Sequence, residues 1–221
     1  MKATVVLLPG LGADRRLFGP QEAVVDDLVV PAWPEPKPRE SLPEFAARLA
    51  DSVPRSECLY LGGSSFGGMV ALELAALLRP KGVLLIGSCT HPSSIAPLAR
   101  SVRRLASALP VSCFRPRRWM LPFVLPKSGC LTPGQRELVW SMALATPASF
   151  LKWGVEAILS WRPTPVAVPV HHVHGSHDRL IPLRLVRPDR VVFGGGHLLT
   201  LTHSQEVNLF LAQALSSAAH V

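Results

Sequence analysis

The stretch LYLGGSSFGGMVALELAA, Leu59 to Ala76, places two adjacent serines among four glycines, with an apolar run on either side. The run before the glycines has the composition of a buried strand, and the run after them that of a helix. A serine on a sharp turn from strand to helix can act as a nucleophile, provided that the residues two before and two after it are small. The stretch therefore raises the question of whether one serine does chemistry.

The spacing of the glycines distinguishes the two serines. Ser64 has a glycine two residues before it but Phe66 two residues after it, and phenylalanine is too large for the turn. Ser65 has Gly63 and Gly67 at these positions, which gives the pattern G-x-S-x-G and lets the backbone bend sharply. We therefore expect Ser65 to be the nucleophile and Ser64 to be only its neighbour.

Apolar runs alternate with helical patterns over most of the 221-residue chain. The run at residues 3–10 ends in Pro-Gly and is typical of a strand buried on both faces of a parallel sheet. Ser41 and Glu44 form a capping box that predicts the start of a helix. This alternation predicts an α/β fold with a mostly parallel sheet of about six strands, which binds ligands beyond the carboxyl ends of its strands. Strands are expected at residues 3–10, 28–33, 58–63, 82–88, 166–175 and 189–196, and helices at 41–53, 66–80 and 204–218.

The alternation is interrupted between residues 89 and 165, where prolines break the helical pieces and no strand pattern is clear. Thr132-Pro133 and Thr146-Pro147 each look like a helix start, with threonine as the N-cap and proline as the first helical residue. This segment leaves the carboxyl end of one strand and rejoins before the next, so it can cover the binding edge. We therefore expect a core domain of residues 1–88 and 166–221, with a helical cap at residues 89–165.

A serine nucleophile needs a base, and the base needs an acid that orients it. In a sheet of this kind the acid and the histidine follow the serine in that order, each just after a strand. Asp178 follows the fifth expected strand, whereas the end of the fourth offers no acid. His197 is the first side chain after the three glycines that end the sixth. We therefore expect Ser65, Asp178 and His197 to form a catalytic triad.

Acyl transfer to a serine also needs backbone N–H groups that stabilise the developing negative charge. One is expected from Phe66, directly after the serine, and the other from Leu11 in the loop PGLG after the first strand. The alternative for this loop is an ordinary tight turn, and it lacks the residues of a phosphate-binding loop. The expected oxyanion hole therefore consists of these two N–H groups.

The other histidines and the cysteines are expected to be structural. His174 and His177 lie close to Asp178 and suggest a metal site, but further ligands are lacking elsewhere. We therefore expect no metal ion and no cofactor. Free thiols are expected at the four cysteines, whose spacing is not that of a metal site: Cys58, Cys89, Cys113 and Cys130.

The net charge of +8 is concentrated in the expected cap. Residues 89–165 carry ten basic and two acidic residues, and the rest of the chain is balanced. Such a field can attract an acyl group on an acidic carrier protein or on coenzyme A, although a solvated basic surface is the alternative. The tryptophans of this segment can line an acyl pocket or simply pack its helices. The residues expected to contact substrate or carrier are Arg100, Arg103, Arg104, Trp119 and Trp153.

No segment reaches the ~18 consecutive apolar residues that suggest a membrane span, and the start of the chain lacks the pattern of a signal peptide. We therefore expect a cytoplasmic protein without a transmembrane segment. Nucleic-acid binding is not expected, because the basic residues lie in an apolar segment that resembles no nucleic-acid module.

Taken together, the stretches LLPGLGAD, LGGSSFGGMVALELA, VHGSHDRLIP and GGGHLLTLTHSQEV resemble, in this order, motifs of the α/β-hydrolase superfamily. The resemblance covers nearly the whole chain and implies a Ser65 nucleophile, a His197 base and an Asp178 partner. The chain starts at what resembles the third strand of the family, which implies a trimmed sheet. Pro9-Gly10 departs from the His-Gly of many relatives, which alters the support of that loop.

The resemblance implies a serine carboxylesterase that acts on a small-molecule ester or on an acyl group linked to a carrier. The small cap and the carboxyl-terminal pattern resemble esterases that cleave pimeloyl-carrier-protein methyl esters. A thioesterase acting on acyl-coenzyme A or acyl-carrier protein is one alternative. A ligand-binding member of the same fold without catalytic activity is another.

Overall fold

A computed structural model of the chain describes residues 2–95, 108–117 and 131–217. Its strands are β1 (Thr4–Leu8), β2 (Leu28–Val29), β3 (Leu59–Ser64), β4 (Gly82–Ile86), β5 (Val170–Gly175) and β6 (Arg190–Val192). They form one sheet in the order β2-β1-β3-β4-β5-β6, and every neighbouring pair is parallel. The expected α/β fold with a parallel sheet of six strands is confirmed.

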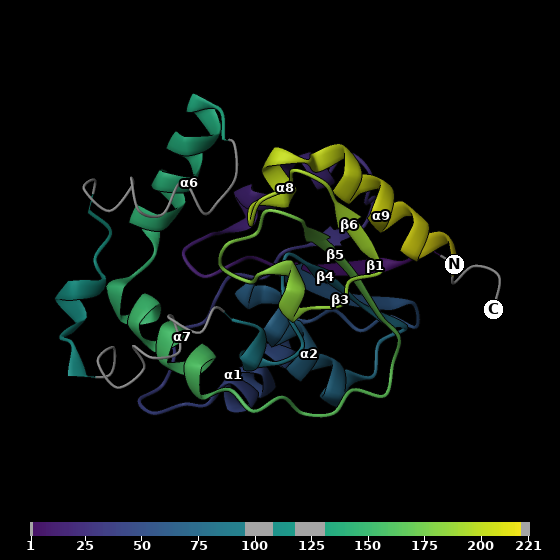
Figure 1. Cartoon of the computed structure of the whole chain (residues 1–221). Helices are drawn as coiled ribbons and strands as arrows, with labels where there is room; N and C mark the ends of the chain where they lie inside the picture. The colour runs from purple at the N-terminus through teal and green to yellow at the C-terminus, as the bar shows by residue number, and fades with distance from the viewer. Residues whose placement is uncertain (1, 96–107, 118–130, 218–221) are drawn as a thin grey trace.

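Helices flank the sheet on both faces (Figure 1). The α-helices are α1 (Leu42–Leu49), α2 (Phe66–Leu78), α6 (Pro133–Ala145), α7 (Ala148–Ser160), α8 (Leu199–Thr202) and α9 (Ser204–Ser217). Short 3-10 helices are η1 (Arg15–Gln21), η2 (Ala50–Ser52), η3 (Pro92–Ser94), η4 (Val111–Phe114) and η6 (Leu183–Leu185). The helices α1 and α2 cover one face of the sheet, and α8, α9 and η1 cover the other.

Both faces of β1 are buried, as its continuous apolar composition predicts. Val6 and Leu8 point to the side of α1 and α2 and belong to one hydrophobic cluster. Val5 and Leu7 point to the opposite side, into a second cluster that includes residues of η1 and α9. This alternation between two cores holds the carboxyl end of β1, and the loop that follows it, in a fixed position.

Several local predictions agree with the structure. Ser41 and Glu44 form the expected capping box at α1, and Thr132 with Gln135 forms another at α6. The expectation for Thr146 is wrong: the N-cap of α7 is Pro147, and the Thr146 hydroxyl instead donates to the Met142 carbonyl 3.0 Å away. Thr146 is therefore the C-cap of α6 and not the N-cap of α7. The Thr-Pro pair alone does not distinguish these two positions.

Several elements differ from the sequence-based expectation, and both β5, which begins at Val170, and β6, which ends at Val192, are shorter than expected. β2 pairs with β1 only at Leu28 and Val29, although residues 28–33 were expected to form the strand. Pro31 lacks a backbone N–H and cannot donate to the ladder, which explains why the edge strand stops early. The short helix α8 precedes α9 and was not expected from the sequence.

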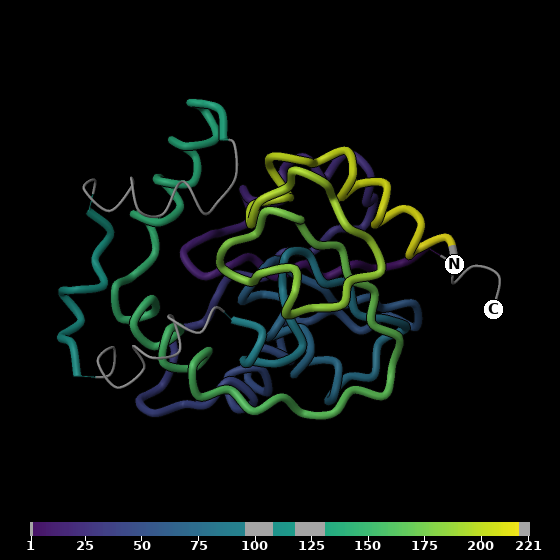
Figure 2. The backbone as a smooth tube through the Cα atoms, in the orientation of Figure 1, coloured from purple at the N-terminus to yellow at the C-terminus, as the bar shows by residue number. Residues whose placement is uncertain are grey.

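The segment between β4 and β5 contains no strand in its described residues, 89–95, 108–117 and 131–165. Its helices α6 and α7 stand to one side of the sheet in Figure 1. From α7 the chain returns to β5 in a long stretch that runs along the lower side of the molecule in Figure 2. The buried Glu73 carboxylate of α2 holds this stretch, since it accepts hydrogen bonds from Trp161 Nε1 and from the N–H and hydroxyl of Thr164.

Among the residues that the structure describes, no helix is long and apolar enough to cross a membrane.

Candidate active site

Ser65 occupies a strained turn between β3 and α2. Its φ of +52° and ψ of −118° lie outside the regions that residues other than glycine normally adopt. Hydrogen bonds fix the turn: the Ser65 N–H donates to the Ile86 carbonyl at 3.1 Å, and the Ser65 carbonyl accepts from the Ser88 hydroxyl at 2.6 Å. The turn therefore presents the Ser65 side chain at the carboxyl edge of the sheet.

The two flanking glycines are required by space. A Cβ atom at Gly63 would lie 2.5 Å from the Leu8 carbonyl oxygen and from the Gly67 carbonyl carbon. A Cβ atom at Gly67 would overlap the same Leu8 carbonyl. Since both obstacles are backbone atoms of neighbouring elements, they cannot move aside as a side chain would. This is the physical basis of the G-x-S-x-G pattern in this chain.

His197 connects Ser65 to Asp178. His197 Nε2 lies 2.8 Å from Ser65 Oγ, and His197 Nδ1 lies 2.7 Å from Asp178 Oδ2. The other carboxylate oxygen of Asp178 accepts the backbone N–H groups of Leu180 and Ile181 at 2.8 and 2.9 Å. The structure therefore brings the three expected residues together in the order Ser65, His197 and Asp178.

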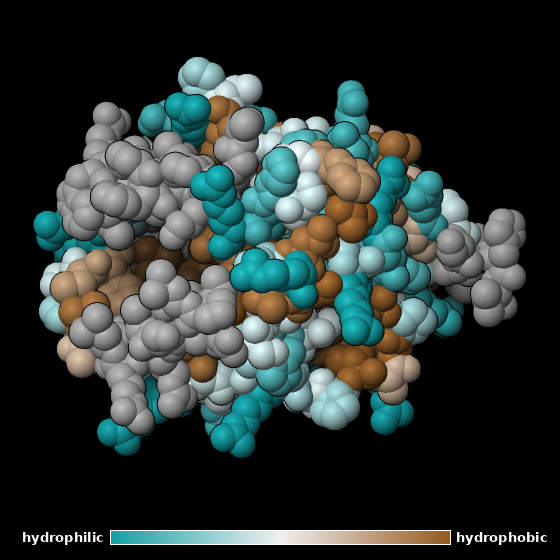
Figure 3. Space-filling view, in the orientation of Figure 1, coloured by the Kyte–Doolittle hydropathy of each residue, from teal (hydrophilic) through white to brown (hydrophobic). Residues whose placement is uncertain are grey.

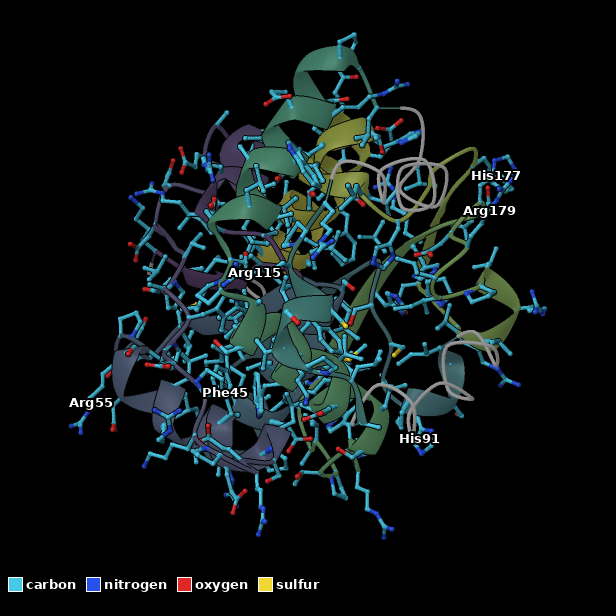
Figure 4. All side chains as sticks on the ribbon, turned by 90° about the vertical axis from the view of Figure 1, so that its left-hand side faces the viewer. Phe45, Arg55, His91, Arg115, His177 and Arg179 are labelled. Carbon is cyan, nitrogen blue, oxygen red and sulfur yellow. The ribbon has the colours of Figure 1, made fainter. Side chains whose placement is uncertain are left out.

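The burial of Asp178 opposes its ionisation, because a buried charge loses its hydration. The electrostatic interaction with His197, the hydrogen bonds from His197 and Ile181, and the nearby His174 outweigh this effect and hold the pKa of Asp178 below its usual value. Its sequence neighbours His177 and Arg179 point outward at the surface in Figure 4. Asp178 is therefore an ionised carboxylate that faces inward, toward the base.

Close packing of two loops brings the acid and the base together. A Cβ atom at Gly175, at the end of β5, would overlap the Gly195 carbonyl of the loop after β6. The His177 N–H also donates to that Gly195 carbonyl at 2.8 Å. The loops that carry Asp178 and His197 therefore pass with backbone against backbone, which only glycine permits at these points.

The loop after β1 lies beside the nucleophile. A Cβ atom at Gly10 would be 3.7 Å from Ser65 Cβ, and Gly12 adopts a φ of +80°. No hydrogen bond between described residues occupies the backbone N–H of Leu11 or of Phe66. Both groups are thus available to bind an oxyanion formed at Ser65.

A hydrophobic cavity of about 380 Å³ opens above Ser65 and His197. It extends between the sheet edge and the helices α6 and α7, where Figure 3 shows hydrophobic residues in a hollow. None of the described residues that line it is Asp, Glu, Lys or Arg. Its apolar walls come from Leu11, Leu17, Met69, Ile95, Val139, Met142, Val155, Ile158, Leu159, Leu180, Ile181 and Leu198.

Trp153 is the one expected substrate-contacting residue that lies within the described part of the chain. Trp153 does not line the cavity: its ring packs on Phe45 at 4.4 Å between centroids, and its Nε1 donates to the Glu40 carbonyl. Trp153 thus packs α7 against α1, the second of the two roles that the sequence left open. The remaining predicted contacts lie outside the described residues: Arg100, Arg103, Arg104 and Trp119.

Sequence reasoning missed the residues that line the cavity. Val155, Ile158 and Leu159 recur at helical spacing in α7, which predicts an apolar face but not what that face covers. It also missed the contact of α7 with the oxyanion loop, where a Cβ atom at Gly154 would overlap Leu11 Cδ1. Within the described part of the chain, no group of three or more His, Cys, Asp and Glu residues is arranged to hold a metal ion.

The alpha/beta hydrolase family model matches residues 5–208, and the chain therefore belongs to this family. No curated protein sequence matches the chain.

Solved structures of hydrolases share the fold. A thermophilic esterase from Thermogutta terrifontis, with malate bound, is 19% identical with a TM-score of 0.77, over 97% of this chain and 90% of that one. The enol-lactonase from Burkholderia xenovorans LB400 is 18% identical with a TM-score of 0.74, over 98% and 92%. The RedJ thioesterase from the prodiginine biosynthetic pathway in Streptomyces coelicolor is 20% identical with a TM-score of 0.65, over 97% and 90%. At these identities the likeness extends to the fold.

Proposed function

We propose that this protein is a serine hydrolase that cleaves a carboxylic ester through an acyl-serine intermediate. The observation that carries the proposal is the hydrogen-bonded chain from Ser65 through His197 to Asp178, at the floor of an apolar cavity. A serine hydroxyl is a weak nucleophile unless an adjacent base removes its proton, and the hydrogen bond between His197 and Ser65 supports that role for His197. The strained backbone of Ser65 supports the same role, because such strain concentrates at functional sites.

The proposed reaction proceeds in two halves. His197 Nε2 takes the proton of Ser65 Oγ as this oxygen attacks the ester carbonyl, and the carbonyl oxygen becomes an oxyanion held by the N–H groups of Leu11 and Phe66. His197 then gives its proton to the departing alcohol as the ester C–O bond breaks. Water attacks the acyl-serine with His197 again as base, which releases the acid and restores Ser65. Asp178 fixes the Nδ1–H tautomer of His197 and stabilises its charged form.

We further propose that residues 89–165 form a cap over a core of residues 1–88 and 166–221. In support, α6 and α7 contribute walls to the cavity above Ser65. The absence of Asp, Glu, Lys and Arg from the described lining favours an apolar acyl group, since a charge would be costly to desolvate there.

We propose that the leaving group is bound by the protein surface outside this cavity. The excess positive charge of residues 89–165 supports a substrate attached to an anionic carrier, either an acidic carrier protein or coenzyme A. A thioester joins the acyl group to such a carrier, so the serine can attack either that thioester or an ester elsewhere on the acyl group. An uncharged ester without a carrier needs no cationic surface. A ligand-binding protein of the same fold without activity is the other candidate.

A panel of p-nitrophenyl esters with acyl chains of increasing length tests the enzyme proposal. We expect hydrolysis by the wild-type chain and a loss of at least about a thousandfold in kcat/KM for Ser65→Ala. Ser64→Ala is the matched control, because Ser64 is adjacent but buried, with 1% of its surface exposed. Wild-type protein that cleaves none of the esters at a rate above Ser65→Ala would favour the ligand-binding alternative.

Salt dependence tests the carrier proposal separately. If cationic residues attract the carrier, kcat/KM on an acyl-coenzyme A or acyl-carrier substrate should fall as ionic strength rises, and Arg103→Ala with Arg104→Ala should lower it further. The p-nitrophenyl ester rate should change little in both experiments. A carrier substrate whose rate is insensitive to salt and to both substitutions would exclude electrostatic docking.

A further inference from the structure

Two buried histidines of β5 lie behind the triad and have no part in the proposed reaction. His172 and His174 are two residues apart on the strand, so their side chains share one face of the sheet. His174 is completely buried and His172 is 6% exposed. A buried polar ring must find hydrogen-bond partners, and the partners found here are informative.

The two rings form a chain that ends at the triad acid. His174 Nε2 lies 2.7 Å from the Ile181 carbonyl oxygen and 3.5 Å from Asp178 Oδ2. Its Nδ1 lies 3.2 Å from His172 Nε2, with the ring planes at 82°. Asp178 Oδ2 is also the oxygen that accepts from His197 Nδ1. Asp178 Oδ2 therefore has a hydrogen bond with His197 on one side and a longer electrostatic contact with His174 on the other.

The partners determine where the protons are. The Ile181 carbonyl oxygen can only accept, so His174 Nε2 must carry the hydrogen. A neutral imidazole has one N–H, so His174 Nδ1 is then an acceptor, and the hydrogen between the two rings must come from His172 Nε2. Two neutral rings satisfy both of these contacts: the His172 N–H is directed toward His174, and the His174 N–H toward the Ile181 carbonyl.

We propose that His174 is a positioning residue of the triad: a neutral Nε2–H donor that holds the Ile181 carbonyl and faces Asp178 from behind, with its tautomer set by His172. The Ile181 N–H binds Asp178 Oδ1, so His174 fixes the same turn from its other side. The carboxylate then cannot rotate away from His197. The catalytic part of this inference rests on the proposed function, whereas the tautomers do not.

The surroundings of the pair favour neutral rings. Burial and the adjacent His174 ring lower the pKa of His172 to about 3. A hydrogen bond with the Ser88 backbone acts in the opposite direction but is outweighed. Burial also lowers the pKa of His174. The titratable groups around the pair are Asp178, His197, Cys89 and Asp189. Burial raises the pKa of the Cys89 thiol to about 12. The Asp189 carboxylate accepts a hydrogen bond from the backbone N–H of His172.

Nitrogen-15 NMR of the histidine rings in the whole chain tests the tautomers without any substrate. We expect both His172 and His174 to be protonated at Nε2 alone and to remain so from pH 8 to pH 5. His172→Phe and His174→Phe assign the signals, and His171 on the opposite face of β5 serves as the internal comparison. Protonation of His174 at Nδ1, or a pair that carries two N–H groups on one ring at pH 7, would overturn the proposal.

Substitution tests the positioning role. His174→Phe removes the donor, and we expect kcat on a p-nitrophenyl ester to fall about 10- to 100-fold with KM nearly unchanged, because a small misplacement of the acid is costly. The low-field proton signal of His197 Nδ1 should move upfield at the same time. His174→Gln keeps an N–H donor and should recover most of both readouts, and His171→Phe should change neither.

Folded His174→Phe protein with unaltered kcat and an unaltered His197 signal would contradict this role. If His174→Phe does not fold, His174→Gln is compared with His174→Ala. Values of kcat and of the His197 proton signal close to wild type in His174→Gln support the proposal. Losses in His174→Gln equal to those in His174→Ala contradict it. If no ester is cleaved by the wild-type chain, the proposed function fails while the NMR signals still test the arrangement of His172, His174 and Asp178.

Discussion

At the scale of single residues, the turn at Ser65 depends on atoms that cannot move. Gly67 packs against the Leu8 carbonyl of β1, so the turn at Ser65 and the strand β1 are in direct backbone contact. A side chain larger than hydrogen at Gly67 therefore cannot be accommodated without moving β1. The buried Ser64 hydroxyl has no hydrogen-bond partner among the described residues, in agreement with a residue whose position is set by the turn.

We predict that Gly67→Ala lowers the free energy of unfolding by about 3 kcal/mol or more, or prevents folding, since its Cβ would overlap the Leu8 carbonyl. Gly134→Ala is the matched control, because nothing lies within 4 Å of a Cβ at that helical position. It should be neutral or stabilise the chain by up to about 1 kcal/mol. Urea denaturation of both variants measures the difference, and equal stabilities would show that the contact at Gly67 is not tight.

At the scale of elements, α7 has two tasks in the same short stretch. Its residues Val155, Ile158 and Leu159 form part of the cavity wall, while Gly154 admits the side chain of Leu11. The Leu11 backbone belongs to the proposed oxyanion hole. The helix that lines the cavity thus also supports the loop of the proposed oxyanion hole.

We predict that Leu11→Ala lowers kcat several-fold, although the backbone N–H is kept, because the loop loses its packing on α7. Gly154→Ala should also lower kcat, since its Cβ would overlap Leu11 Cδ1 and displace the loop. The double variant should recover part of the loss, because the added methyl group occupies some of the space that Leu11 leaves. Coupling of about 1 kcal/mol in a double-mutant cycle is expected, and strictly additive effects would contradict the contact.

Most elements of the core were predictable from the sequence, because each is specified locally. The apolar runs of β1, β3 and β4, the capping box at Ser41 and the glycines around Ser65 all carry their own signals. The order Ser65, Asp178, His197 also located three residues that the structure brings within hydrogen-bond distance, and their catalytic roles remain a prediction. The local signal failed where tertiary contacts decide: the pattern of α7 shows an apolar helix but not that Trp153 faces α1 while Val155 faces the cavity.

At the scale of the whole molecule, burial of neutral histidines beside the triad makes stability depend on pH. The pKa of His172 is lowered to about 3 in the folded state, whereas in the unfolded chain it has its ordinary value of about 6.5. Below pH 6.5 the unfolded state therefore binds a proton that the folded state does not. The contribution of neutral His172 to the free energy of unfolding is therefore complete above this pH and is lost as the pH falls toward the folded pKa.

We predict that the free energy of unfolding falls by roughly 1 to 2 kcal/mol between pH 6.5 and pH 5 through His172 alone. Over this range most carboxylates of the chain stay ionised, so their contribution is small. His172→Phe should flatten the dependence, and His171→Phe on the opposite face of the strand should not. Denaturation at four pH values measures the slope; a stability that is constant over this range would show that folding does not lower the pKa of His172.

The most direct test of the central claim is to locate a covalent adduct on the chain. A fluorophosphonate reacts with a serine only when a neighbouring base activates it, and peptide mass spectrometry identifies the serine that is modified. We predict one adduct, on Ser65, that is retained in Ser64→Ala and lost in Ser65→Ala and in His197→Ala. An unmodified wild-type chain, or an adduct on any serine other than Ser65, would contradict the account.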